Sequence, residues 1–287
     1  MEFIVHDTLT PIASLLEQPL ERRPDALREI LEPMRASIPM PGDIVGIHHQ
    51  GGGFRVDADD PRYLPAVRRM IEQDVLGQVK HELERASQAL GGATQPDKLD
   101  VFLILGDPGN EHLMKISGGY YGMGAGTSYI YLLAWPSDEV IGRISHLAVH
   151  EFHHHVRFSN VEWDPVAVTV GEHVVAEGLA EAFVREQSGP EAMGPWSSMV
   201  TGEAFDGAFE KIMADFDLQG MQNTPAYVLG DTTARRFGGE PRGIPDMAGY
   251  AVGLHLVDKA LAATGMSAAE ATVVPAAELL RRGGVRG

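Results

Sequence analysis

The sequence predicts an α+β fold in which a small sheet lies in the first half of the chain and helices fill the second half. Two short apolar runs, residues 98–105 and 127–135, are bounded by proline or glycine and are typical of strands. Beyond residue 136, apolar residues recur mainly at helical spacing. We therefore expect a mixed α/β lobe over residues 1–136 and a helical lobe over residues 137–287, which share a cleft and form one continuous unit.

The composition narrows the kinds of site that the chain can carry. Its 287 residues include 40 acidic and 23 basic ones, which gives a formal net charge of -17. Surfaces that bind nucleic acid are usually basic, so we exclude a nucleic-acid partner. The chain has no cysteine. Any metal ion therefore has to be held by histidine, aspartate or glutamate.

The N-terminal residues, Met1–Asp7, lack the basic segment and apolar run of a secretory signal. No later segment contains about 18 consecutive uncharged apolar residues, the length that a membrane-spanning helix needs. We therefore expect a cytoplasmic protein without a membrane partner.

The chain before residue 98 is predicted to be mainly helical. After a short extended start, helices are expected over residues 8–20 and 24–37. The Gly51–Asp57 segment is expected to be a loop that leads into a short strand, and it lacks the Lys-Ser/Thr pair of a phosphate-binding loop. Apolar spacing over residues 61–90 then predicts one long surface helix.

The strand predicted over residues 98–105 is followed by Gly118–Gly126, which is too rich in glycine to predict regular structure. The second strand, residues 127–135, is rich in residues that favour strands. We expect it either in the core or at the rim of the cleft, where an extended peptide could add as a further strand.

Ser137 is the expected N-cap of a helix over residues 138–158, whose first turn is acidic. A break that contains proline then precedes a second helix over residues 168–187. The remaining predicted segments are a helix over residues 202–216, an irregular stretch over 220–245 and a helix over 246–264.

The helix predicted over residues 138–158 contains His150-Glu151-Phe152-His153-His154, a complete HExxH motif. Residues four apart lie on one face of a helix, so His150 and His154 can bind a single ion, with Glu151 beside them. A divalent ion lowers the pKa of a bound water, and a glutamate can take the proton as the water attacks a carbonyl. The motif predicts metal-assisted hydrolysis; the alternative is a solvent-facing group of histidines.

A catalytic zinc site usually has three protein ligands and one position for water. The next predicted helix carries Glu177-Gly178-Leu179-Ala180-Glu181, and the 22 residues between His154 and Glu177 allow the chain to turn and return antiparallel. We therefore expect Glu177 as the third ligand and Glu181, one turn later, as the acceptor of a hydrogen bond from a ligand imidazole. The alternative is that both are ordinary exposed carboxylates.

Neighbouring residues leave some assignments open. Arg157 and Asn160 occupy the positions where a metzincin would have glycine and its third histidine, which excludes that class. His146 and His150 could form a shifted ligand pair, although no glutamate follows His146. His153 and His155 are expected to support a ligand or to lie at the surface. His173, one turn before Glu177, is the better candidate for support, and its alternative is a histidine of the core.

The negative charge that develops on the substrate oxygen in the transition state needs a hydrogen-bond donor besides the metal. Tyr250 and His255, near the start of the late helix, are the candidates, and we select Tyr250. The alternative is a core tyrosine whose hydroxyl group is satisfied structurally.

These motifs, with the glycine-rich lead-in to the second strand and Gly249-Tyr250-Ala251-Val252-Gly253, resemble a bacterial family of predicted zinc-dependent proteases that is catalogued as a domain of unknown function. The resemblance covers roughly the last two thirds of the chain. The chain is also similar to the gluzincins, which implies a gluzincin-like fold and one zinc ion. By that resemblance the ligands are His150, His154 and Glu177, the general base is Glu151, and Glu181 stands where gluzincins usually have an aspartate.

We therefore expect a zinc metallopeptidase of gluzincin type whose partner is a peptide or protein substrate. The first alternative is a non-catalytic regulatory or interaction protein that keeps the metal only to stabilise its fold. The second is a metallohydrolase that acts on another class of compound.

Overall fold

The computed structural model describes residues 1–37, 42–124 and 127–286, and it confirms the mixed α and β class. The chain forms two compact units, Met1–Arg85 with Pro96–Glu151 and Ala86–Gln95 with Phe152–Gly287. Residues 151 and 152, where one unit ends and the other resumes, belong to one continuous helix, α6 (Ile144–Asn160). The division into lobes over residues 1–136 and 137–287 stays a prediction.

Within the described ranges, the first unit contains a four-stranded sheet in the order β1-β2-β4-β3. Its strands are β1 (Glu2–Val5), β2 (Lys98–Leu105), β3 (Tyr120–Met123) and β4 (Tyr129–Ala134). The first three strands of this order are parallel, and β3 runs antiparallel to β4. Strand β2 confirms the strand predicted over residues 98–105.

Strand β4 lies between β2 and β3, so the prediction that this strand could form the rim is wrong. All six of its residues are buried, as is typical of a strand with both faces covered. The edge of the sheet next to β4 is β3, which forms inside the segment predicted to lack regular structure. Hydrogen bonding to β4 makes this glycine-rich segment a regular strand, which its local composition does not predict. Residues 125 and 126 of that segment lie outside the described residues.

The helices before the second strand differ from the prediction at two points. Helix α3 (Ile44–Gln50) was not predicted, and the loop after it leads to an isolated bridge between Gly53 and Gly106 rather than to a strand. The helix predicted over residues 61–90 is two helices, broken where Asp74 adopts a left-handed φ of 51°. The helices of this region are α1 (Leu9–Leu16), α2 (Arg23–Ser37), α4 (Tyr63–Glu72) and α5 (Val75–Ala89).

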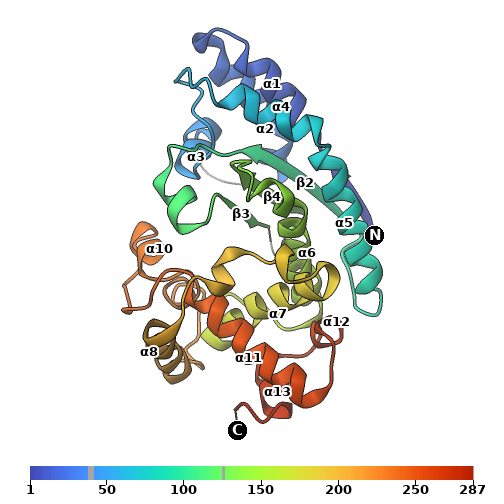
Figure 1. The fold of residues 1–287 in the computed structure, drawn as a ribbon, viewed down its shortest axis with the longest axis vertical. Coiled ribbons are helices and arrows are strands. Elements are labelled where there is room, and N and C mark those ends of the chain that lie inside the picture. Colours follow the sequence, from blue (N-terminus) through green and yellow to red (C-terminus); the bar gives the residue numbers. More distant parts are fainter. Residues whose placement is uncertain (38–41, 125–126, 287) are drawn as a thin grey trace. The chain divides into compact units, whose positions relative to one another are not determined.

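The chain after the sheet is helical, as predicted (Figure 1). Ser137 accepts a hydrogen bond from the backbone N–H of Val140 at 3.3 Å, but it does not cap α6. A short 3₁₀ turn, Ile141–Arg143, comes first, and α6 begins only at Ile144. The stretch expected to be irregular contains two short helices. The elements after α6 are α7 (Val170–Ser188), α8 (Gly202–Ala214), α9 (Thr224–Val228), α10 (Asp231–Arg236), α11 (Ala248–Thr264), α12 (Ala268–Ala271) and α13 (Ala276–Arg282). None of the described helices is both long enough and apolar enough to cross a membrane.

Helices α7 and α11 pack side by side through glycines (Figure 1). A Cβ atom on Gly178 would lie 2.2 Å from the carbonyl carbon of Gly253, and a Cβ atom on Gly253 would lie 2.1 Å from the backbone oxygen of Val174. Both obstacles are backbone atoms, which cannot rotate away. The close approach of the two helices therefore requires glycine at both positions.

Replacing Gly178 with alanine should force α7 and α11 apart. We expect Gly178→Ala to lower the free energy of unfolding by at least the roughly 1–3 kcal/mol typical of an overpacked site. The matched control is Gly207→Ala on α8, where an added Cβ meets no atom within 4 Å. Because alanine favours a helix over glycine, Gly207→Ala should be neutral or stabilise by up to about 1 kcal/mol. Urea unfolding of both variants measures the difference, and equal stability would contradict this account of the packing.

Candidate metal centre

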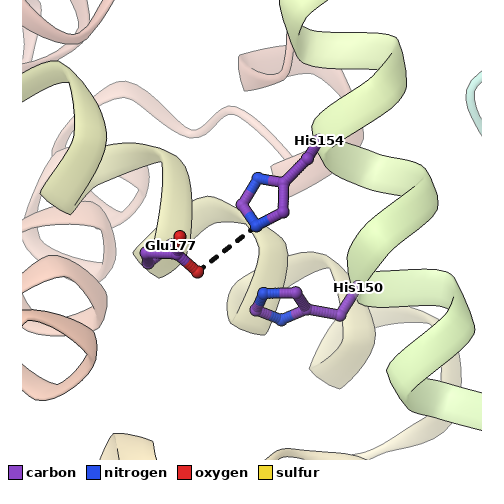
Figure 2. A group of neighbouring side chains, drawn as sticks. All are labelled: His150, His154 and Glu177. Atoms are coloured by element: carbon purple, nitrogen blue, oxygen red, sulfur yellow. Dashed lines mark hydrogen bonds and ion pairs between the residues drawn. The ribbon is translucent and has the colours of Figure 1, made fainter. Parts of the chain in front are cut away.

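The HExxH motif lies on helix α6, and its two histidines and its glutamate are buried. His150, Glu151 and His154 are only 3%, 7% and 5% exposed. The two imidazoles project from the same side of α6 towards Glu177 (Figure 2). This burial rules out the alternative of a solvent-facing histidine group.

Helix α7 supplies the carboxylate. The helix begins at an N-cap in which the Thr169 hydroxyl accepts a hydrogen bond from the N–H of Glu172 at 3.0 Å. Two turns of helix later, Glu177 is 7% exposed, and its Oε2 lies 3.3 Å from Nε2 of His154. One ligand atom from each of His150, His154 and Glu177 lies within 4.8 Å of the others. The structure thus brings together the three residues that the sequence selected.

The geometry and donor types of this group fit zinc. Two ligand atoms that are each about 2.0 Å from a tetrahedral ion lie about 3.3 Å from one another. The 3.3 Å distance between His154 Nε2 and Glu177 Oε2 has this value. Two imidazoles and one carboxylate are also a ligand set of catalytic zinc sites, where three protein ligands leave one position for water or substrate. The buried group could therefore hold one ion.

Glu151 lies against the edge strand of the sheet. A Cβ atom on Gly122 of β3 would be 2.4 Å from Cγ of Glu151 and 2.6 Å from its Oε1. The glycine therefore leaves the space that the glutamate side chain fills. Gly122 carries no signal in the sequence, because only the pairing of β3 with β4 brings it to Glu151.

His173 contacts the ligand carboxylate from the side away from His154. Its Nε2 lies 3.4 Å from Oε1 of Glu177, and its Nδ1 is 2.9 Å from the hydroxyl of Thr224. The first distance is that of an ion pair, and the threonine hydroxyl also donates to the carbonyl oxygen of Met221 at 3.3 Å. His173 therefore lies beside the carboxylate, and the supporting role that the sequence suggests for it stays a prediction.

Glu181 holds a loop. It is 1% exposed, and its Oε2 accepts hydrogen bonds from the N–H of Gly194 at 2.9 Å and from the hydroxyl of Ser197 at 2.8 Å. The hydrogen bond from a ligand imidazole to Glu181 stays a prediction. The loop residue Trp196 in turn packs on Tyr250, with ring centroids 5.6 Å apart.

The remaining histidines have different surroundings. His153 and His155 are 0% and 2% exposed, so the prediction that they could be surface groups is wrong; His153 Nε2 lies 3.1 Å from the hydroxyl of Thr272. His146 is not a member of the ligand group found among the described residues, and its burial lowers its pKa. His255 packs between two phenylalanines of α8. The role of Tyr250 as a donor to the transition state stays a prediction.

Comparison with known proteins supports the metal assignment. The profile of a family described as "Predicted Zn-dependent protease (DUF2268)" matches residues 79–281. Two curated relatives come from Bacillus subtilis (strain 168) and are named as uncharacterized proteins. YjfC is 34% identical over 183 residues, 64% of this chain and 60% of YjfC, and YjaZ is 26% identical over 219 residues, 76% of this chain and 78% of YjaZ.

The chain therefore spans about 60% of the length of YjfC. No solved structure matches the chain significantly. The profile covers most of the chain, including both helices that carry the buried histidines and the carboxylate. This protein belongs to the family of predicted Zn-dependent proteases.

Proposed function

We propose that this protein is a zinc-dependent metallopeptidase of gluzincin type, with one ion held by His150, His154 and Glu177. The observation that carries the proposal is the buried ligand group, whose atoms lie within 4.8 Å of one another on helices that follow one another in the chain. The adjacent Glu151 supplies the acid–base group that hydrolysis needs. The family description supports zinc and proteolysis.

When bound, zinc polarises the scissile carbonyl and lowers the pKa of water. Glu151 is the proposed general base, which takes the proton of the attacking water and returns it to the leaving amine. Tyr250 is the proposed donor to the developing oxyanion. His173 and Glu181 keep their neighbours in place, the first by its contact with Glu177 and the second through the loop around Ser197.

The edge strand β3 is the proposed binding surface for an extended peptide. It is the last strand of the described sheet, and its Gly122 lies against Glu151. An extended substrate can add to such an edge through main-chain hydrogen bonds, which do not depend on its sequence. A peptide paired with β3 would thus pass beside the proposed base.

Glu151→Gln tests the base. Glutamine has nearly the same shape but cannot take a proton, so we expect full zinc content and a loss of peptide hydrolysis of about 10²–10⁴-fold. Zinc is measured by elemental analysis, and hydrolysis by mass spectrometry of a digested peptide library. Glu162→Gln, at an exposed position on the chain after α6, is the matched control and should retain activity. Unchanged turnover in Glu151→Gln would reject the base assignment.

Removal of the metal distinguishes the proposed enzyme from a non-catalytic protein that the metal only stabilises. Chelation should abolish hydrolysis, and added zinc should restore it, while the far-UV circular dichroism stays largely helical. Bound metal also stabilises the fold by mass action, by about 4 kcal/mol at a thousandfold excess over Kd, so the melting temperature should fall. A metal-loaded protein that cuts no peptide and unfolds on chelation would instead favour the regulatory or interaction protein.

Gly122→Ala tests whether the space beside β3 matters for Glu151. The new methyl group would overlap the glutamate side chain and displace its carboxylate, and a shift of about 1 Å can cost about 10²-fold in rate. We expect kcat to fall while zinc affinity stays unchanged. Gly142→Ala, which meets no atom within 4 Å, is the control. If both variants cleave like the parent, Gly122 does not position the base.

A further inference from the structure

Two of the three candidate ligands have an aromatic or imidazole neighbour about one helical turn away on their own helix. On α6, Phe158 follows His154 by four residues, and the two rings stack with centroids 5.6 Å apart and planes at 22°. On α7, His173 precedes Glu177 by four residues, with Nε2 3.4 Å from Oε1. Each ligand is thus contacted by a ring from its own helix.

Trp163 joins these two neighbours. It lies on the connection between α6 and α7, after the first helix ends at residue 160 and before the second begins at residue 170. Its indole stacks on Phe158 with centroids 3.6 Å apart and planes at 20°. It also packs against His173 in a T-shaped contact, with centroids 5.4 Å apart and planes at 82°.

The contact between His154 Nε2 and Glu177 Oε2 at 3.3 Å completes a closed ring of five side chains. The members, in order, are His154, Phe158, Trp163, His173 and Glu177, and we call this set the support cluster. Thr224, which is fully buried and not a member of the cluster, forms a 2.9 Å hydrogen bond with His173.

The support cluster restricts the side-chain rotations that would move a ligand atom out of place. Stacking on Phe158 opposes rotation of the His154 imidazole about its Cβ–Cγ bond. The contact with His173 opposes rotation of the Glu177 carboxylate and leaves its other oxygen towards His154. Both neighbours are partly exposed, so contacts with other side chains are needed to limit their motion. Trp163, packed on both, keeps them in position.

We infer that Trp163 is a positioning residue of the metal centre, which fixes the orientations of His154 and Glu177 before an ion binds. This inference rests on the proposed zinc site and adds a residue that touches no ligand directly. Metal affinity should depend on Trp163 because an ordered set of ligands loses less conformational entropy on binding than a mobile set.

Trp163→Leu and Trp163→Phe test the inference in the full chain. Leucine keeps apolar volume but removes the aromatic face, whereas phenylalanine keeps a face that can stack on Phe158. We expect Trp163→Leu to raise the Kd for zinc by about 10–100-fold, the range for residues that orient metal ligands, and Trp163→Phe to restore most of the loss. Zinc is titrated in competition with a chromophoric chelator. The visible spectrum of the cobalt-substituted protein reports the ligand geometry independently of activity.

The control is Trp135→Leu, the same change at a half-buried tryptophan that packs on Tyr63 at 6.5 Å in the first unit. It should leave the zinc Kd and the cobalt spectrum unchanged. His173→Phe removes the nitrogen that faces Glu177 but keeps a ring for Trp163. If Trp163 acts through His173, the losses of Trp163→Leu and His173→Phe should be less than multiplicative in the double variant.

An unchanged zinc Kd and cobalt spectrum in Trp163→Leu, or fully multiplicative losses in the double variant, would overturn the inference. Should Trp163→Leu fail to fold by circular dichroism, Trp163→Met, which also removes the aromatic face, takes its place in both measurements. A parent protein that binds no zinc would reject the proposed function itself, which the titration of the parent shows separately.

Discussion

A carboxylate buried against histidines is the constraint on which the rest of the helical unit depends. Glu177 is 7% exposed, and a charge taken out of water costs several kcal/mol unless partners compensate for it. His154 and His173 face its two oxygens, and a divalent ion bound there would add positive charge beside the carboxylate. The surrounding helices hold this costly group in place, because a carboxylate free to move would turn towards water.

Two further features fix the position of α7. Gly178, the direct neighbour of Glu177 in sequence, allows α7 to approach α11 closely. The fully buried Arg157, one turn after His154, pairs with Glu172 of α7 and donates hydrogen bonds of 3.0 Å to the carbonyl oxygens of Thr272 and Val274. The C-terminal segment therefore helps to fix the spacing of the ligand-bearing helices.

The difference between what could and could not be predicted follows from the range of the interactions. Residues 98–105 form the predicted strand, because a run of apolar β-formers between turn residues carries its own signal. The helix predicted over residues 61–90 is broken at Asp74, where a left-handed residue interrupts a pattern whose apolar spacing continues on both sides. Residues 127–135 were expected either in the core or at the rim of the cleft. The sequence could not decide between these places, because strand order depends on pairing between segments rather than on either segment alone.

The sequence by itself determined the metal-binding chemistry. An HExxH motif, a second helix with Glu177 and the absence of cysteine restrict the ligands to imidazole and carboxylate, since helical periodicity and residue type are local properties. Only the tertiary structure decided that Gly122 makes room for Glu151, that Trp163 links Phe158 to His173, and that Glu181 holds the loop at Ser197. These contacts join side chains whose elements meet only when the chain packs, so no spacing along the sequence encodes them.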